Sequence, residues 1–458
     1  MTFNTLTQYD NAHFIHPWES MGQLGDQQRT FSHKAQGIYV TDEQGRQLID
    51  GPGGMWCVQI GYGRQEMAQA IADQVLQSAY YSPWNMTSAP AAKLAHKLAQ
   101  LSPGDLNHVF FTTGGSTAVD TALRFVQFYN NALGRPEKKR IISRAQAYHG
   151  STYLAASVSG KERDRTFMDT AESLVHFLPH VNPLQRPSGQ TMEAFCDAKV
   201  ADLESAILSL GADNVAAFIA EPILASGGVV IPPKGYHRRC KEICQQYQVL
   251  YIADEVVTGF GRLGHWFASE QVFDMVPDLM TSAKGLTSGY LPLGACFISD
   301  RLVQQLQGVE ATFANGYTYS GHPVSCAAAL KNIEIIEQEQ ILQQVRDNSP
   351  YFLQQLQRLK DLPIVMDVRA IGLVGCVECS IDAQGQSSLE EDAKLGYRID
   401  AHCQALGLIV RPIINMCVLS PALIITRQEI DDMVNILEQG IRLTVADLQA
   451  EGLLEKEG

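Results

Sequence analysis

Two acids and one lysine stand at positions where the sequence could bring them into one reactive site. The run Val249 to Ala253 is apolar and rich in β-formers, and Asp254 and Glu255 follow it directly. Such a run predicts a strand buried on both faces of a parallel sheet, and ligands gather where the strands of such a sheet end. Further on, Lys284 lies among small uncharged neighbours in Thr-Ser-Ala-Lys-Gly. Burial among such neighbours disfavours the ammonium form, which favours an amine that acts as a nucleophile.

The same stretch contains a pattern that points to another class of cofactor. Residues 259–264 match GxGxxG, the fingerprint of dinucleotide-binding folds. That fingerprint also requires a helix that opens at the loop and an acid about 20 residues further on. No long amphipathic pattern follows residue 264, and the position expected for the acid holds Lys284. A nicotinamide-nucleotide site is therefore disfavoured.

Three other predicted strands end in residues that suit a phosphate and an aromatic ring. Gly115 and Ser116 lie where a strand leads into a helix, and the free N–H groups of a helix start bind anions. Tyr148 and Glu221 end two further strands. Each feature alone has an ordinary structural explanation, such as a capped turn, but their combination is typical of a pyridoxal phosphate site. The combined set is Gly115, Ser116, Tyr148, Glu221, Asp254 and Lys284.

The hydrophobic pattern predicts an α/β fold. From about residue 106, strand and helix patterns alternate, which indicates a mostly parallel sheet of seven strands between helices. After about residue 322 helices dominate, and a hairpin is predicted over 37–51, so both ends should form a smaller α+β domain. We expect an N-terminal segment at 1–58, a large domain at 59–322 and the rest of the small domain at 323–458. The predicted strands are 108–112, 140–143, 174–177, 215–220, 249–254, 278–281 and 294–299, with strand-like runs at 371–379 and 407–414. The predicted helices include 66–79, 91–101 and 327–340, and 160–198 is interpreted as an irregular excursion over the surface.

Composition limits the classes of partner. The 458 residues are 45% hydrophobic and 18% charged, which indicates a soluble globular chain with more than one core. A formal net charge of −14 argues against nucleic acid or an acidic membrane as a partner. The first residues show no signal-peptide pattern, and no uninterrupted apolar run reaches the roughly 18 residues of a membrane span. A cytoplasmic enzyme with small-molecule substrates is therefore expected.

The ten cysteines are scattered, and two spacings invite a metal interpretation. Cys376 and Cys379 lie in a run that predicts a strand, where an odd separation points two side chains to opposite faces. His237, Cys240 and Cys244 fall on one face of a predicted helix, but no fourth ligand is evident. We interpret all ten cysteines as reduced and structural, and we expect no metal.

With these motifs in hand, the chain resembles the class III (ω-) aminotransferases over nearly its whole length. These are fold-type I enzymes that use pyridoxal 5'-phosphate. The residues that carry the resemblance are GMWCVQIGYGR (54–64), FFTTGGSTAVDTALRF (110–125), AYHGST (147–152), EPILASGG (221–228), IADEVVTGFGRLG (252–264), SAKGL (282–286) and NGYTYSGHPVSCAAAL (315–330). The chain departs from the family pattern at Thr117, Val119 and Ala370, where Glu, Asn and Gly are usual.

The resemblance implies roles for the matching residues around the cofactor ring. Lys284 would bond to the cofactor aldehyde and move a proton between the substrate and cofactor carbons. Asp254 would pair with the ring nitrogen. Val256 would pack on one face of the ring and Tyr148 over the other.

The resemblance also implies a phosphate site shared between two subunits. Gly115 and Ser116 would hold the phosphate, and Thr318 would join them from the partner subunit. A homodimer or a dimer of dimers is therefore expected.

The substrate is less determined than the chemistry. Trp56 resembles the amine–pyruvate branch of the family, and Arg411 matches a mobile arginine that pairs with a substrate carboxylate, unless it forms a structural ion pair. We expect Trp56, Tyr148 and Trp84 to form an apolar pocket. The resulting prediction is transfer of an amino group from an amine or ω-amino acid, such as a diamine or β-alanine, to pyruvate by a ping-pong mechanism. A 2-oxoglutarate-dependent enzyme of the 4-aminobutyrate or ornithine type, an aminomutase and a decarboxylase remain alternatives.

Overall fold

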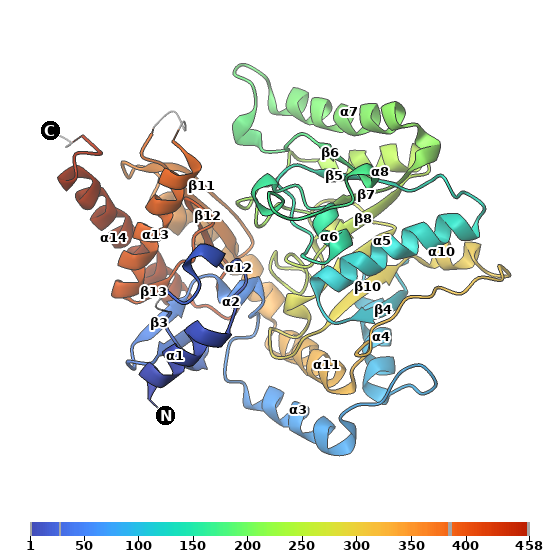
Figure 1. Ribbon diagram of the computed structural model, residues 1–458, viewed down its shortest axis with the longest axis horizontal. Helices are drawn as coiled ribbons and strands as arrows, with labels where there is room; N and C mark the ends of the chain where they lie inside the picture. The colour runs from blue at the N-terminus through green and yellow to red at the C-terminus, as the bar shows by residue number, and fades with distance from the viewer. Residues whose placement is uncertain (1, 27–28, 383–386, 456–458) are drawn as a thin grey trace.

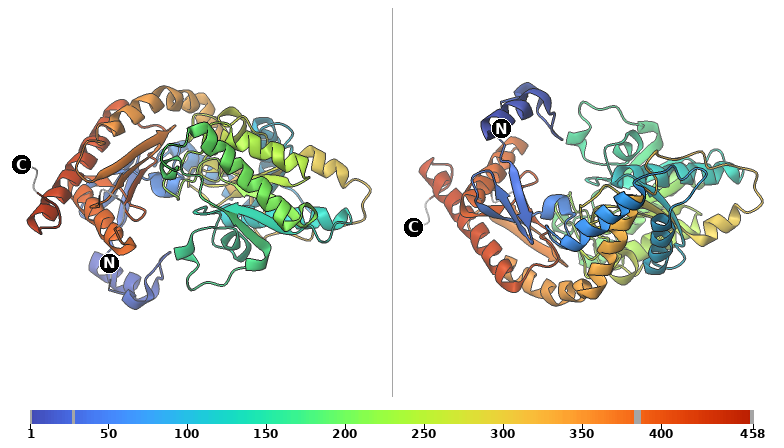
Figure 2. Two further views of the ribbon diagram at one scale, coloured as in Figure 1. Left: turned by 90° about the horizontal axis from the view of Figure 1, so that it is seen from above. Right: turned by 90° about the horizontal axis from the view of Figure 1, so that it is seen from below.

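The computed structural model describes residues 2–26, 29–382 and 387–455. A larger unit holds a central sheet between helices, and a smaller unit built from both ends of the chain lies beside it (Figure 1). The two turned views keep the same arrangement, with both chain ends on the side of the smaller unit (Figure 2).

The central sheet has seven strands in the order β4-β10-β9-β8-β7-β5-β6. Only β10 is antiparallel to its neighbours β4 and β9, and the remaining pairs are parallel. The strands are β4 (His108–Thr112), β5 (Arg140–Arg144), β6 (Val175–Leu178), β7 (Val215–Ala220), β8 (Leu250–Asp254), β9 (Leu279–Ser282) and β10 (Gly294–Ile298). All seven predicted strands are confirmed, each within one residue at either end.

Two separate cores cover the two faces of this sheet. Residues 217–220 of β7 and 250–253 of β8 alternate between them: Phe218 and Tyr251 pack in one core, and Ile219 and Ile252 in the other. Every residue of both strands is buried, which explains why both sequences are apolar up to Asp254 at the end of β8. The covering helices include α4 (Ala89–Leu101), α5 (Gly115–Ala132), α7 (Met192–Leu210), α8 (Tyr236–Gln246) and α11 (Pro323–Gln338).

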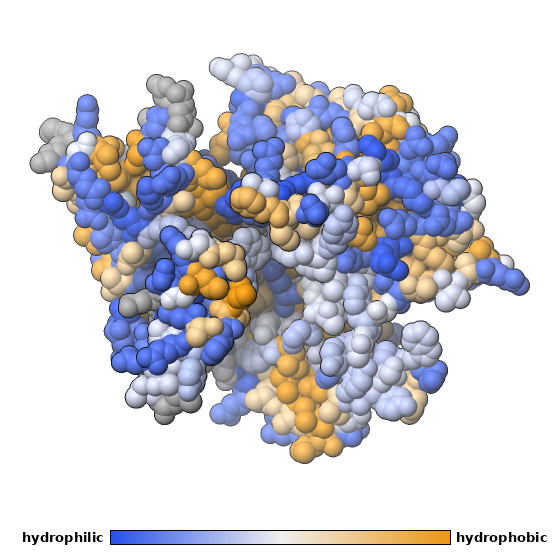
Figure 3. Space-filling view, viewed as in Figure 1, coloured by the Kyte–Doolittle hydropathy of each residue, from blue (hydrophilic) through white to orange (hydrophobic). Residues whose placement is uncertain are grey.

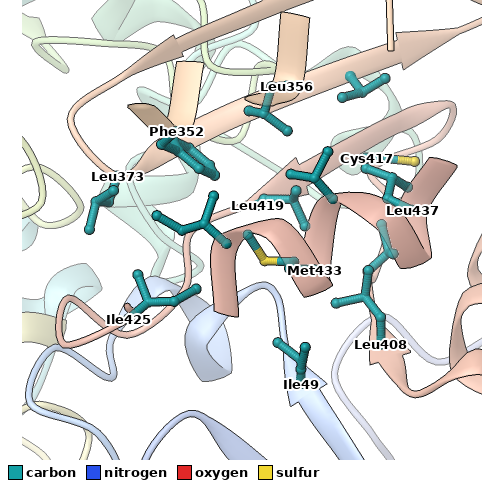
Figure 4. Close-up of a cluster of buried hydrophobic side chains, with 14 of the residues drawn as sticks. Ile49, Phe352, Leu356, Leu373, Leu408, Cys417, Leu419, Ile425, Met433 and Leu437 are labelled. Carbon is teal, nitrogen blue, oxygen red and sulfur yellow. The ribbon is translucent and has the colours of Figure 1, made fainter. Parts of the chain in front are cut away.

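The smaller unit is held together by a strand pair between the two ends of the chain. Its four-stranded sheet has the order β1-β2-β3-β13, and β3 pairs in parallel with β13. Figure 4 shows the core beside this pair, in which Ile49 and Leu408 lie close to Met433 and Leu437. The strands are β1 (Ser32–Gln36), β2 (Tyr39–Asp42), β3 (Gln47–Asp50), β11 (Val365–Ile371), β12 (Val374–Cys379), β13 (Leu408–Ile409) and β14 (Met416–Leu419). The helices are α12 (Ile341–Gln357), α13 (Leu389–Leu406) and α14 (Arg427–Ala450).

Two predicted strands of the smaller unit were wrong in extent. The run 371–379 spans the end of β11 and the whole of β12, because Gly372 turns the chain between them with a φ of +59°. In the run 407–414 only β13 forms a strand, because Arg411 adopts a positive φ and Pro412 follows it. The predicted hairpin is present as β2 and β3. The remaining helices are α1 (Phe3–His13), α2 (Gly53–Trp56), α3 (Gln65–Ser78), α6 (Tyr153–Ser157), α9 (Ala268–Gln271) and α10 (Asp300–Gln305).

Nine of the ten cysteines are buried, and Cys57 is half-buried. Cys376 and Cys379 belong to different hydrophobic cores, as the odd spacing predicted. His237 has both ring nitrogens in hydrogen bonds, with the Tyr251 hydroxyl at 2.7 Å and the Pro222 carbonyl at 2.8 Å. All ten cysteines are free thiols, and the described residues contain no group of side chains arranged to hold a metal ion. Nor does any helix in the described ranges have the length and apolar character to cross a membrane.

Candidate active site

A cavity of about 990 Å³ opens where the central sheet meets the smaller unit. The surface is hollowed between these two parts of the molecule (Figure 3). Nine of the residues singled out in the sequence line this one cavity: Trp56, Gly115, Ser116, Tyr148, Glu221, Asp254, Val256, Lys284 and Arg411. The lysine amine and the strand-end acid therefore share one space.

The start of helix α5 forms one wall of the cavity. Gly114 precedes the helix, and no side chain caps its first N–H groups, so these donors are available to an anion. A Cβ on Gly115 would lie 3.0 Å from a methyl group of Val256, so a glycine allows the backbone to come this close. Ser116 is fixed by its neighbour, because the Ser151 N–H donates to Ser116 Oγ at 3.1 Å.

Asp254 ends β8 and is held from three directions. Its Oδ1 accepts the Val256 N–H at 3.1 Å and the Thr281 hydroxyl at 3.0 Å. Its Oδ2 lies 2.6 Å from His149 Nδ1, and both side chains are buried. Because a carboxylate only accepts hydrogen bonds, His149 carries its proton on Nδ1. His149 was not among the residues predicted to form the site, although it directly follows Tyr148.

Lys284 follows β9 and reaches the cavity from an unusual backbone conformation. Its φ is +45°, a region that is costly for a residue with a side chain and is found most often at functional sites. Burial lowers the pKa of its amine, and Asp254 opposes this shift. Its Nζ lies 5.8 Å from the ring centre of Trp56. The structure therefore places a weakly basic amine against an aromatic wall.

Tyr148 and Glu221 are joined to each other. The Tyr148 N–H donates to Glu221 Oε1 at 3.1 Å, and the Ala225 N–H donates to Glu221 Oε2 at 3.2 Å. Burial raises the pKa of the Glu221 carboxyl group. Glu221 thus fixes the loop that presents the Tyr148 ring, whose hydroxyl lies 3.0 Å from Ser151 Oγ.

Arg411 enters the cavity from the smaller unit. Asp400 accepts the backbone N–H of Arg411 at 3.1 Å, which positions the residue, and its guanidinium group contacts the sulfur of Met55. Burial lowers the pKa of Arg411. Its side chain forms no ion pair with any described residue, so the structural ion pair considered from the sequence is not observed.

Trp84 and Thr318 lie outside the cavity of their own chain. Trp84 is 89% exposed. The Thr318 carbonyl accepts a hydrogen bond from the Tyr80 hydroxyl at 2.6 Å, at a surface that also carries the exposed ring of Tyr319. An own-chain pocket of Trp56, Tyr148 and Trp84 is therefore not formed.

Sequence reasoning missed several residues that line the cavity, among them Trp18, Lys161 and Ser226. Lys161 lies in the segment interpreted as a surface excursion, and Trp18 lies before the first strand. Neither stands in a periodic pattern that could have placed it. The glycine-rich loop 259–264 is structural, since buried Arg262 donates to the carbonyls of Leu373 and Pro421 at 2.9 and 2.6 Å.

Comparison with known proteins agrees with this geometry. The model of the family described as aminotransferase class-III matches residues 21–441. The chain belongs to the class III aminotransferases. The putrescine–pyruvate aminotransferase of Pseudomonas aeruginosa is 38% identical over 96% of each chain. A mitochondrial gamma-aminobutyrate transaminase 1 of Oryza sativa is 35% identical over 95% of this chain and 86% of its own length. The crystal structure of an (S)-enantioselective omega-transaminase from Thermomicrobium roseum matches with a TM-score of 0.91 and 35% identity, covering 98% of this chain and 99% of the other.

Class III aminotransferases use pyridoxal 5'-phosphate, and the residues of this aminotransferase fit that group. An uncapped helix start beside two glycines suits a phosphate, and the acid anchored by His149 suits a protonated ring nitrogen. When bound, the cofactor supplies a ring that withdraws electrons from the substrate carbon.

We propose the following assignment of this enzyme's residues. Gly115 and Ser116 would hold the phosphate, and Asp254 would keep the ring nitrogen protonated. Tyr148 and Val256 would flank the ring. Lys284 would hold the aldehyde carbon and, once released, carry a proton to and from the substrate carbon.

Proposed function

We propose that this class III aminotransferase moves an amino group from an amine or ω-amino acid to pyruvate. The donor leaves as an aldehyde or ketone before pyruvate enters, and pyruvate leaves as alanine. Both half-reactions use one cavity, so the cavity must accept a carboxylate in one half-reaction and an amine in the other.

The observation that carries this proposal is the unpaired guanidinium of Arg411. Arg411 is exposed toward the cavity that it lines, and a substrate carboxylate would give its guanidinium group an ion-pair partner through two parallel hydrogen bonds. Apolar side chains, including Trp18, Trp56 and Leu291, line the same cavity and suit a donor without charge near its amine. The similarity to the putrescine–pyruvate aminotransferase of Pseudomonas aeruginosa supports pyruvate as the acceptor.

A 2-oxoglutarate-dependent enzyme is the second candidate. Gamma-aminobutyrate transaminases of plants are 35–36% identical to this chain, close to the identity of the putrescine–pyruvate enzyme. A second lysine in the cavity, Lys161, gives this candidate a physical basis, because 2-oxoglutarate carries two carboxylates.

Replacing Arg411 by Gln tests the first candidate. We expect KM for pyruvate to rise about 10- to 100-fold, which corresponds to the loss of a hydrogen-bonded charge pair. KM for an amine without a carboxylate should change less than about threefold, because its binding does not use the guanidinium. Steady-state kinetics with both substrates varied would give these constants.

Arg163→Gln is the matched control, since Arg163 lines the same cavity but already pairs with Asp164 at 3.2 Å. It should leave the KM for pyruvate within about threefold of the wild type. Equal losses for pyruvate and for the amine in Arg411→Gln would assign Arg411 to structure and remove the support for this proposal.

We further propose that the active enzyme is a homodimer. Apolar side chains are exposed in the last turn of α3, in the segment after it and near Thr318: Leu76 at 86%, Tyr81 at 62%, Trp84 at 89%, Met86 at 59% and Tyr319 at 55%. Figure 3 shows hydrophobic surface at the lower edge of the molecule, by α3. An exposed patch of this kind is typical of a subunit interface. A second subunit docked there would cover Trp84 and bring Thr318 toward the partner's cavity.

A further inference from the structure

Besides Arg411, the cavity is lined by a second cation without an ion-pair partner among the described residues, Lys161, and the proposed reaction does not use it. Lys161 follows α6, is partly buried and lines the same cavity as Lys284. Its Nζ donates to the Ser226 carbonyl at 2.8 Å and lies 5.5 Å from the ring centre of Tyr148. One hydrogen bond leaves two of its three N–H donors for another partner.

The carboxylates of the cavity are all engaged elsewhere. Asp254 bonds to His149, and Glu221 accepts two backbone N–H groups. Asp400 accepts the N–H groups of Val410 and Arg411 at 3.0 and 3.1 Å. Asp164 pairs with Arg163 at 3.2 Å. In the described part of the chain, Lys161 and Arg411 are thus two cavity cations without an ion-pair partner.

A buried hydroxyl group without a hydrogen-bond partner among the described residues lies beside Lys161. Ser226 lines the cavity and is 8% exposed, and its Oγ is buried without a hydrogen-bond partner among the described residues. An unsatisfied buried hydroxyl is unfavourable, and rotation about one bond can turn it toward a new acceptor. The Ser226 carbonyl already accepts a hydrogen bond from the ammonium of Lys161, so the Lys161 ammonium and the Ser226 hydroxyl lie in the same part of the cavity.

We infer that Lys161 and Ser226 bind a carboxylate at the distal end of a substrate whose other end reacts at Lys284. This inference rests on the proposed function, because it uses the same cavity and reaction. The distal carboxylate has two possible sources, an ω-amino acid donor or a dicarboxylic keto acid such as 2-oxoglutarate. A diamine is disfavoured, since its distal ammonium would meet Lys161 and no free acid.

The charge of Lys161 makes such binding dependent on pH. Burial lowers its pKa to about 8, Arg163 acts in the same direction, and Glu221 and Asp164 oppose the shift. The ring of Tyr148 faces the ammonium and carries no charge in this range. Lys161 is charged below its pKa, so affinity for the distal carboxylate should be present below about pH 8 and decrease as the pH rises above it.

The test compares substrates that differ only at the distal end. The holoenzyme and its Lys161→Met, Lys161→Arg and Ser226→Ala variants are assayed with 4-aminobutyrate, butylamine and 1,4-diaminobutane, each with pyruvate. For Lys161→Met we expect KM for 4-aminobutyrate to rise about 10- to 100-fold while its kcat and both constants for butylamine stay within about threefold. Lys161→Arg should retain most of the affinity, and the diamine should improve in Lys161→Met.

A second arm identifies the source of the carboxylate. If Lys161→Met instead raises the KM for 2-oxoglutarate but not the KM for pyruvate, the site exists and binds the acceptor. Binding of pentanoate to the holoenzyme can be measured by calorimetry and does not need turnover. From pH 7 to pH 9 its affinity should decrease about tenfold in the wild type but not in Lys161→Arg.

Three results would overturn the inference. They are equal losses for butylamine and 4-aminobutyrate with no selective loss of either acceptor, a wild-type preference for the diamine that Lys161→Met does not change, and pentanoate binding that is unaffected by the pH or by Lys161. Failure of the wild-type enzyme to use pyruvate with any donor would refute only the proposed function. The pentanoate measurement would still test the carboxylate site.

Discussion

Replacing Asp254 by Asn should separate catalysis from folding. The substituted side chain would keep an oxygen in place for the two donors that Asp254 Oδ1 now accepts, the Val256 N–H and the Thr281 hydroxyl. The new amide group would face His149 Nδ1, which could become an acceptor by moving its proton to Nε2, a buried atom without another partner in the described structure. We therefore expect the free energy of unfolding to fall by only about 1–2 kcal/mol.

The effect on activity should be much larger. An asparagine side chain carries no charge, so the proton on the ring nitrogen would lose the acid that stabilises it in a buried site. Breaking a buried ion pair by removing one partner costs about 3–5 kcal/mol. If this cost falls on the transition state, kcat/KM decreases by roughly 10²- to 10⁴-fold. The assay is steady-state turnover of the cofactor-loaded variant, with chemical unfolding measured in parallel.

The neighbouring acid provides a matched control. Glu255 is also fully buried, but it does not line the cavity: it accepts the Thr258 hydroxyl at 2.6 Å and the N–H groups of Ala268 and Ser269 at 2.9 and 2.6 Å. Glu255→Gln would leave one buried N–H facing an amide donor, at a cost of about 1–3 kcal/mol in stability. Its folded fraction should keep nearly normal kcat/KM. The reasoning is refuted if Asp254→Asn stays within tenfold of wild type, or if the two variants lose activity equally.

Three further outcomes follow from the geometry. Lys284→Ala should abolish multiple turnover while the protein still binds the cofactor without a covalent bond, as absorbance after gel filtration would show; sustained turnover would exclude the lysine from the mechanism. Gly150→Ala would place a Cβ 2.5 Å from Ser116 Oγ and should weaken cofactor binding at least about tenfold, whereas Gly22→Ala, with nothing within 4 Å, should not. If Thr318 serves the partner's site, mixing inactive Lys284→Ala and Thr318→Glu subunits should restore roughly a quarter of wild-type activity, and no recovery would argue against a shared site.

The central sheet could be predicted from sequence because burial on both faces imposes a simple rule on its residues. Strands such as β7 and β8 must be apolar throughout, and their polar side chains can appear only where the strand ends. Asp254, Tyr148 and Lys284 were visible for that reason. Strand β1, with the polar sequence Ser-His-Lys-Ala-Gln, shows no such pattern, and only pairing with β2 makes it a strand.

Sequence reasoning missed some of the residues that shape substrate choice, because they lie outside regular buried strands. Lys161 and Trp18 stand in irregular segments, where contacts distant in sequence set the conformation and no periodic pattern indicates it. Arg411, which has a positive φ, was predicted only through the resemblance to the family. A sheet edge that must hold one cofactor constrains residue types strongly, whereas a cavity rim that must fit a particular donor constrains only charge and shape. The reaction can thus be inferred from strand ends alone, but the substrate depends on which rim charges remain unpaired, and that requires the folded arrangement of Lys161, Arg411 and the acids around them.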